Sequence, residues 1–195
     1  MVQHLKEQER NEKQIKILED LEKFAMTCLA EVAFGVDINC FSDPENDFFI
    51  KGKTLSEVWR LMGIIFFPSV MKWFRIAAYN PKSVKHFEKM CLQIVEQRKG
   101  SSVEKKDILD SLIKASKDCP LMTPDMMFKT MTQFLTDGYE GFSRIMNTTV
   151  YLLTAHPQAL EKLEEEIEEV MGERDDVTEE DLVSMVYLEQ VREIL

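Results

Sequence analysis

The chain is poor in residues that break helices and in patterns that mark particular classes of protein. Its 195 residues include only seven glycines and six prolines. It has no run of about 18 or more apolar residues and opens with no signal peptide, so the sequence predicts no membrane-spanning segment. Internal repeats and low-complexity tracts are also absent, and no domain boundary is visible.

Clustered cysteines and clustered basic residues are missing too. Cys28, Cys40, Cys91 and Cys119 form no Cys-x-x-Cys pair and lie at no metal-ligand spacing with the three histidines, so no metal site is predicted. Their scattered, mostly apolar surroundings indicate reduced thiols in an intracellular protein. The net charge of −11, with the acidic excess after Glu161, argues against nucleic acid as a partner.

The composition favours an all-α, mostly helical fold. Met, Leu, Glu and Lys are abundant, 45% of the residues are hydrophobic and 30% are charged. Apolar residues recur at spacings of three and four, which indicates amphipathic helices. Helices are expected in the charged run 1–18 and over residues 21–33, 48–60, 81–99, 107–117, 123–155 and 157–171, with a short one starting at Thr178 and another from Met185.

The most apolar stretch is residues 61–79, from Leu61 to Tyr79. It contains a proline and the basic residues Lys72 and Arg75, and is too short and broken to span a bilayer. Burial in the core is the favoured interpretation. The alternative is a surface that touches a membrane or lines an apolar cavity.

The chain is organised around residues 123–155, which have clear signals at both ends. Thr123 is a good N-cap, Pro124 suits the first helical position and Asp125 complements the helix dipole. The residue before a proline avoids helical geometry, so the helix is expected to end at His156.

Asp137-Gly138-Tyr139-Glu140-Gly141 lies in the middle of this stretch and allows two interpretations. An Asp-Gly pair is typical of a turn, and each interior glycine costs a helix about 1 kcal/mol. The apolar face nevertheless continues in phase across the glycines. We therefore expect one helix, with Gly138 and Gly141 on or beside its buried face, where missing side chains let a bulky group approach.

Three passages carry a resemblance to a known family. Residues 137–141 resemble a central-helix motif, Ala/Gly-Gly-x-Asp/Glu-Thr, and LLTAHP (152–157) and LEEEI (163–167) follow at the expected interval. YLEQVREIL (187–195) resembles the lead-in to a Glu-x-x-Arg motif, with Glu193 as its Glu. FGVD (34–37), DP (43–44) and FF (48–49) resemble the end of an earlier helix. In this order they are similar to the middle of a cytochrome P450 of the animal microsomal type.

The resemblance implies the helical centre of a haem-thiolate monooxygenase that inserts one oxygen atom from O2 into an apolar substrate. It implies electrons from an NADPH-cytochrome reductase and a place on the cytoplasmic face of the endoplasmic reticulum membrane. The family's Phe-x-x-Gly-x-x-x-Cys-x-Gly loop does not occur in this sequence, so none of its cysteines is expected to ligate haem iron. Residues 1–195 are therefore expected to form a single partial domain, inactive alone.

The resemblance also implies roles for residues of the central helix. Glu140 matches the acid of an acid–alcohol pair that supplies protons, but Gly141 stands in place of the alcohol. Ser143 is no easy substitute, because two residues turn a helix by about 200°. Our hypothesis is that Asp137 faces the haem pocket as a proton relay or an anchor for a polar substrate. The alternative is that Asp137 faces a solvent channel.

The resemblance implies further residues beside the cofactor, in the substrate pocket and in the region that covers the pocket. Gly138 and Gly141 would leave room for haem, with Asp137 beside it, and Glu193 would join the ion-pair network that supports the haem-binding core. Gln133, Phe134 and Phe142 would line or adjoin the substrate pocket, although plain helix packing also explains them. Trp59 and Trp73, with residues 61–79, match the region that roofs the pocket and touches the membrane.

Two other functions stay open. One is a non-enzymatic helical interaction protein that docks through its apolar stretch or its acidic helix. The other is a degenerate haem protein without monooxygenase activity, an alternative that Gly141 keeps open.

Overall fold

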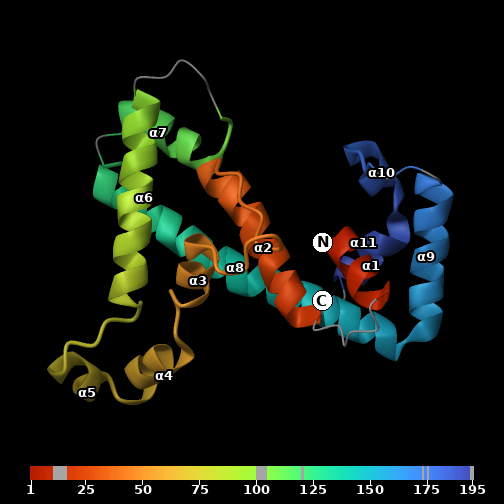
Figure 1. Cartoon of the computed structure of the whole chain (residues 1–195), viewed down its shortest axis with the longest axis horizontal. Helices are drawn as coiled ribbons and strands as arrows, with labels where there is room; N and C mark the ends of the chain where they lie inside the picture. Colours follow the sequence, from red (N-terminus) through yellow and green to blue (C-terminus); the bar gives the residue numbers. More distant parts are fainter. Residues whose placement is uncertain (11–16, 100–104, 120, 173, 175, 194–195) are drawn as a thin grey trace. The chain divides into compact units, whose positions relative to one another are not determined.

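The computed structural model of the chain describes residues 1–10, 17–99, 105–119, 121–172, 174 and 176–193 (Figure 1). Helices make up all the regular elements of these residues, apart from one antiparallel bridge between Ser56 and Tyr79. The chain divides into two compact units, Met1–Phe142 and Ser143–Leu195. The helices are α1 (Val2–Arg10), α2 (Ile17–Phe34), α3 (Asp47–Lys53), α4 (Val58–Phe66), α5 (Pro68–Trp73), α6 (Pro81–Lys99), α7 (Ile108–Asp118), α8 (Pro124–Ala155), α9 (Pro157–Met171), α10 (Glu179–Ser184) and α11 (Val186–Glu193).

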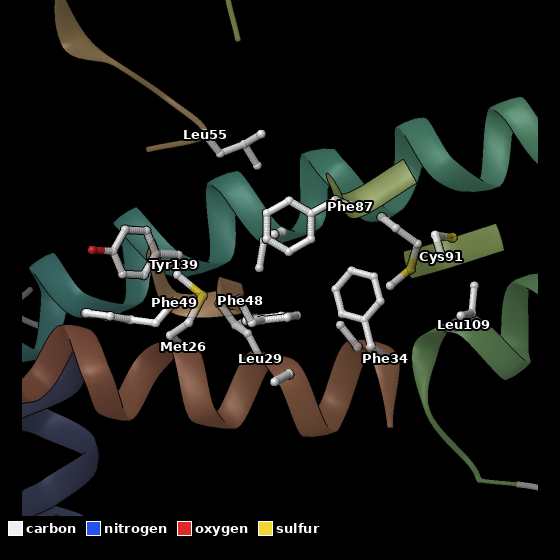
Figure 2. Packing of buried hydrophobic residues seen from close by; sticks show 14 of the residues in the cluster. Met26, Leu29, Phe34, Phe48, Phe49, Leu55, Phe87, Cys91, Leu109 and Tyr139 are labelled. Carbon is white, nitrogen blue, oxygen red and sulfur yellow. The ribbon is translucent and has the colours of Figure 1, made fainter. Parts of the chain in front are cut away.

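The core of the first unit gathers side chains from α2, α3, α6, α7 and the first part of α8. Figure 2 shows Phe34, Phe48 and Phe87 turned toward one another. Phe48 meets the other two edge-on, with ring centroids 5.7 Å from Phe34 and 5.2 Å from Phe87. Aromatic rings favour this arrangement, because the positive edge of one faces the negative face of the next.

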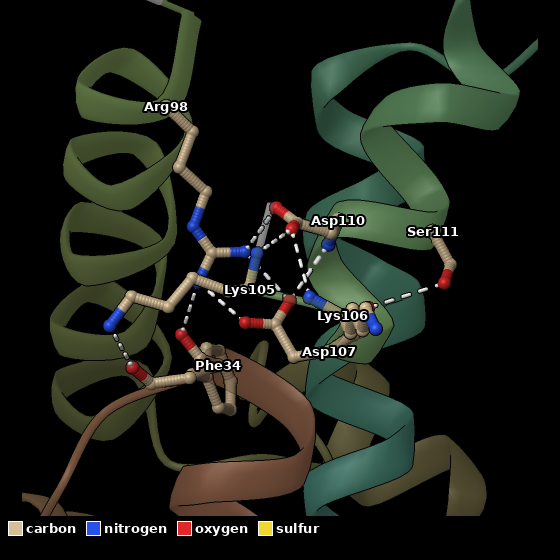
Figure 3. A network of polar contacts seen from close by, with 8 residues as sticks. Phe34, Arg98, Lys105, Lys106, Asp107, Asp110 and Ser111 are labelled. Carbon is tan, nitrogen blue, oxygen red and sulfur yellow. Dashed lines mark hydrogen bonds and ion pairs between the residues drawn. The ribbon is translucent and has the colours of Figure 1, made fainter. Parts of the chain in front are cut away.

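A cluster of charged side chains closes one end of this core (Figure 3). The guanidinium of Arg98, on α6, donates to the carboxylates of Asp107 and Asp110 and to the carbonyl oxygen of Phe34, each at 2.7 Å. Asp107 also caps α7, because its side chain accepts from the backbone N–H of Asp110. One guanidinium thus ties the end of α2 and the start of α7 to α6.

Helix α8 has the bounds that its terminal residues predict. Thr123 Oγ1 accepts from the N–H of Met126, and the helix continues without a break through residues 137–141 to Ala155. The turn interpretation of Asp137-Gly138 is therefore wrong, and the prediction of one helix is confirmed. Its buried face differs from the expected one in part, since Met131, Leu135 and Tyr139 are buried whereas Phe142 and Ile145 are exposed.

The helix expected over residues 48–60 is wrong. α3 ends at Lys53, and α4 begins only at Val58. The break has a tertiary cause: Leu55 is buried in the core, its carbonyl accepts from the N–H of Asn80, and Ser56 forms the bridge to Tyr79. These contacts hold the chain out of helical geometry between the two helices.

Burial of residues 61–79 in the core is also wrong for most of the stretch. Met71 is buried, but most of the large apolar side chains of α4 and α5 are exposed, and Trp73 reaches 83% exposure. No helix among the described residues is both long and apolar enough to cross a bilayer. The apolar side chains here form a surface.

The second unit contains α9, α10, α11 and the last part of α8. α9 begins at Pro157 and ends at Met171, and it is followed by Gly172, whose φ of +56° suits glycine. Thr178 and Asp181 form the predicted capping box of α10. The carboxylate of Glu166, on α9, accepts from the N–H groups of Tyr187 and Leu188 at 2.7 and 2.8 Å, and so caps the start of α11.

Candidate functional site

The first unit has an open hollow on the side of α8. Its volume is about 560 Å³, and four of the predicted site residues line it. Phe134 contributes an apolar ring that is 38% exposed, and Gln133 and Asp137 contribute polar groups. Among the described residues, its lining consists of Lys129, Thr130, Gln133, Phe134, Asp137 and Gly138.

The two glycines of α8 have different surroundings. A Cβ on Gly138 would lie 2.9 Å from a methyl carbon of Leu29, so this glycine lets α2 and α8 approach closely. A Cβ on Gly141 would meet no atom of the described residues within 4 Å. The open approach to the helix backbone is therefore at Gly141, whereas Gly138 has a packing role that needs no cofactor.

Asp137 belongs to a chain of three side chains. Gln133 Nε2 donates to Asp137 Oδ2 at 2.5 Å, and Tyr79 Oη donates to Gln133 Oε1 at 3.3 Å. Sequence reasoning missed Tyr79 as a site residue, because it lies 54 residues from Gln133 and no local pattern joins the two. Leu29 was missed for the same reason. Asp137 itself is exposed, with its carboxylate at the hollow.

The remaining predicted residues lie around this face. Glu140 is half-buried, and Phe142 is exposed, with its ring centroid 6.3 Å from that of Phe24. Tyr139, between the glycines, points into the core, where burial and the neighbouring Glu22 carboxylate raise the pKa of its phenol. Glu193 is exposed at the end of α11, in the second unit. The role predicted for each stays a prediction.

The residues of this α8 face fit a flat, largely apolar group such as haem. The backbone at Gly141 is approachable, the exposed ring of Phe134 lies two turns before it, and the exposed ring of Phe142 is on the next residue. No cysteine is among the residues lining the hollow in the described part of the chain. Burial, the largest cause in each case, raises the pKa of Cys28, Cys40 and Cys91, which keeps these thiols protonated.

In this helical fold, the long helix α8 has an approachable backbone at Gly141, where a planar group can lie against it. The chain belongs to the cytochrome P450 family, whose family model, described as Cytochrome P450, matches residues 1–195. This is a family of monooxygenases with haem as cofactor. The family resemblance and the mostly helical fold predicted from the sequence are both confirmed.

Curated relatives agree with this assignment. Cytochrome P450 9c1 of Drosophila melanogaster is 27% identical over 190 residues, covering 85% of this chain and 36% of that protein. Cytochrome P450 3A41 of Mus musculus is 25% identical over 205 residues, covering 98% of this chain and 41% of that protein. The chain thus spans between a third and about two fifths of the length of these two relatives.

Proposed function

We propose that this chain is the central helical part of a haem-thiolate monooxygenase that inserts one oxygen atom from O2 into an apolar substrate. The observation that carries the proposal is the continuous α8 with an approachable backbone at Gly141. Along the helix, the exposed ring of Phe134 lies two turns before this glycine and that of Phe142 directly after it. Bound haem would supply the activation of oxygen. Its thiolate ligand would come from a part of the protein outside these residues, and the chain alone would be inactive.

Each residue of this face has a proposed task. Gly141 leaves the backbone open to the cofactor, with Gly138 and Asp137 one turn before it. Glu140 holds a proton at its carboxyl group for delivery into the site, and Asp137 holds a second one or orients a polar substrate. The substrate side of the site is lined by Gln133, Phe134 and Phe142.

The proposal extends to the rest of the chain and to its partners. Both compact units belong to one partial domain over residues 1–195, and Glu193 supports the haem-binding core through an ion pair with arginine. Electrons come from an NADPH-cytochrome reductase. The protein sits on the cytoplasmic face of the endoplasmic reticulum membrane and touches the lipid through residues 61–79, whose exposed apolar side chains support this contact.

Gly141 also favours a second candidate function, a haem protein that no longer performs monooxygenation. Glycine has no hydroxyl group for the acid–alcohol pair, and no atom of the described residues lies within 4 Å of a Cβ placed at this position. Gly141→Thr in the native full-length protein therefore separates the two functions.

The test begins with the absorbance of the reduced native protein under carbon monoxide. A red-shifted band typical of thiolate-ligated haem is expected for the full-length protein and not for residues 1–195 alone. Full-length protein without this band would overturn the haem proposal, and residues 1–195 with the band would refute inactivity of the chain alone. In the monooxygenase, Gly141→Thr should raise the share of reducing equivalents recovered in product. If Asp137→Asn left that share and the turnover unaltered, Asp137 would have no part in proton delivery.

A further inference from the structure

The hollow beside α8 presents a carboxylate whose partner is neutral. Asp137 accepts from the amide of Gln133. Among the described residues that line the hollow, the one cation is Lys129, whose Nζ lies 2.7 Å from Asp125 Oδ2, outside the hollow. Asp125 lies one turn before Lys129, toward the N-terminus of α8 and away from Asp137. The negative charge of Asp137 is thus left for a cation that enters the hollow.

The carboxylate of Asp137 is held in position from outside α8. The hydroxyl of Tyr79 donates to the carbonyl oxygen of Gln133, which turns the amide NH2 toward Asp137. Tyr79 is itself anchored, since it packs against the core and forms the bridge to Ser56. A carboxylate can accept about four hydrogen bonds, and this chain of side chains uses one of them. The carboxylate of Asp137 is therefore held in one orientation and can still accept further hydrogen bonds.

Next to this carboxylate lies the exposed ring of Phe134. A carboxylate beside an aromatic face is a good environment for an ammonium group, which gains a charge-assisted hydrogen bond from the first and a cation–π contact from the second. A neutral apolar group gains only the contact with the ring. A carboxylic acid would be repelled.

We infer that Asp137 selects substrates that carry a protonated amine on an otherwise apolar body, with Gln133 and Tyr79 as positioning residues. The inference rests on the proposed function, because it names the substrate class of the same site. It adds to that function a requirement for a positively charged group on the substrate. It also adds Gln133 and Tyr79 as residues that act by positioning Asp137.

Equilibrium dialysis against the native full-length protein tests the inference without relying on activity. The probes are an arylalkyl dimethylamine and its neutral analogue, in which a CH group replaces the nitrogen. The amine should bind about fivefold to tenfold more tightly than the analogue, as expected for a partly exposed ion pair with a charge-assisted hydrogen bond. Added salt should reduce this preference. Equal binding of the two probes, or a preference that salt leaves unchanged, would overturn the inference.

Variants then assign the preference to particular residues. Asp137→Asn should abolish it while leaving the affinity for the neutral analogue unchanged, and Glu45→Gln, at an exposed position outside the hollow, should preserve it. Tyr79→Phe and Gln133→Leu should lower the preference in part, whereas general damage would weaken both probes equally. A preference that persists in Asp137→Asn contradicts the inference. The carbon monoxide spectrum reports separately on the haem function, so the two proposals can fail independently.

Discussion

Arg98 and Asp107 form a two-pronged ion pair in which two guanidinium nitrogens lie 2.7 Å from the two carboxylate oxygens. Only 11% of the Arg98 side chain and 3% of the Asp107 side chain are exposed. The same guanidinium also holds Asp110 and the last carbonyl of α2. Replacing Arg98 would remove this cationic donor from the carboxylates of Asp107 and Asp110 and from the Phe34 carbonyl, at the edge of the core.

The first prediction concerns this ion pair. Arg98→Met should lower the free energy of unfolding of the native full-length protein by about 3 kcal/mol, because an uncompensated buried charge is costly. The measurement is a urea titration followed by circular dichroism. Lys129→Met is the matched control, since its ion pair with Asp125 is exposed and should be worth less than about 1 kcal/mol. Similar losses for both variants would contradict the structural role of Arg98.

The second prediction concerns acid stability. Burial alone would raise the pKa of Asp110, but hydrogen bonds from the Lys105 and Lys106 N–H groups and the charge of Arg98 lower it below its usual value of 3.8. A carboxyl group with a lowered pKa stabilises the fold above its unfolded pKa, and this contribution is lost as the pH falls through the folded value. The free energy of unfolding should therefore fall with pH below about 4.

Asp110→Asn provides the check on this pH dependence. The amide cannot titrate, so the variant should be less stable near neutral pH and should lose less stability on acidification than the native protein. Urea titrations at several pH values measure both effects. Parallel curves for the two proteins would show that Asp110 does not carry the acid sensitivity.

The third prediction contrasts the two glycines of α8. In the cofactor-free protein, Gly141→Ala should raise the free energy of unfolding by up to about 1 kcal/mol, because alanine favours the helix and no described atom lies within 4 Å of the added Cβ. Gly138→Ala gains the same helix propensity but pushes on Leu29, and should destabilise by about 1 kcal/mol. Thermal unfolding of the two variants compares them. The same effect at both positions would refute the close approach of α2 and α8.

The fourth prediction concerns the apolar surface of α4 and α5. Replacing Trp73 and Phe74 by serine should weaken binding to phospholipid vesicles about tenfold, because both large apolar side chains are mostly exposed. Co-sedimentation with vesicles measures the binding. Leu121→Ser is the control, since Leu121 is 79% exposed but lies outside this surface. Equal losses in the control would show that the effect is not specific to residues 61–79.

The sequence predicts well the elements whose limits depend on neighbouring residues. Thr123 and the His156-Pro157 pair define α8, and Pro157 and Gly172 define α9, because caps and prolines act within one turn. The continuity of α8 through its glycines is predicted from the phase of its apolar residues, although Phe142 and Ile145, which continue that phase, are exposed. These features need no knowledge of the tertiary structure.

Other features depend on partners distant in the chain and escape such reasoning. The break after α3 follows from the bridge between Ser56 and Tyr79 and from the burial of Leu55. The apolar character of residues 61–79 is the same in a core helix and in an exposed one, so composition alone favoured the wrong interpretation. At the site, Gln133 and Asp137 follow from the family motif and helix spacing, whereas Tyr79 and Leu29 required the fold.

The cap that Glu166 provides for α11 has a consequence for how this part of the protein can change. The carboxylate of Glu166 holds the N-terminus of α11 against α9 through two hydrogen bonds that do not involve the residues connecting the two helices. Insertions and deletions in that connection should therefore accumulate in related proteins without shifting the helix, as long as an acid remains at this one position.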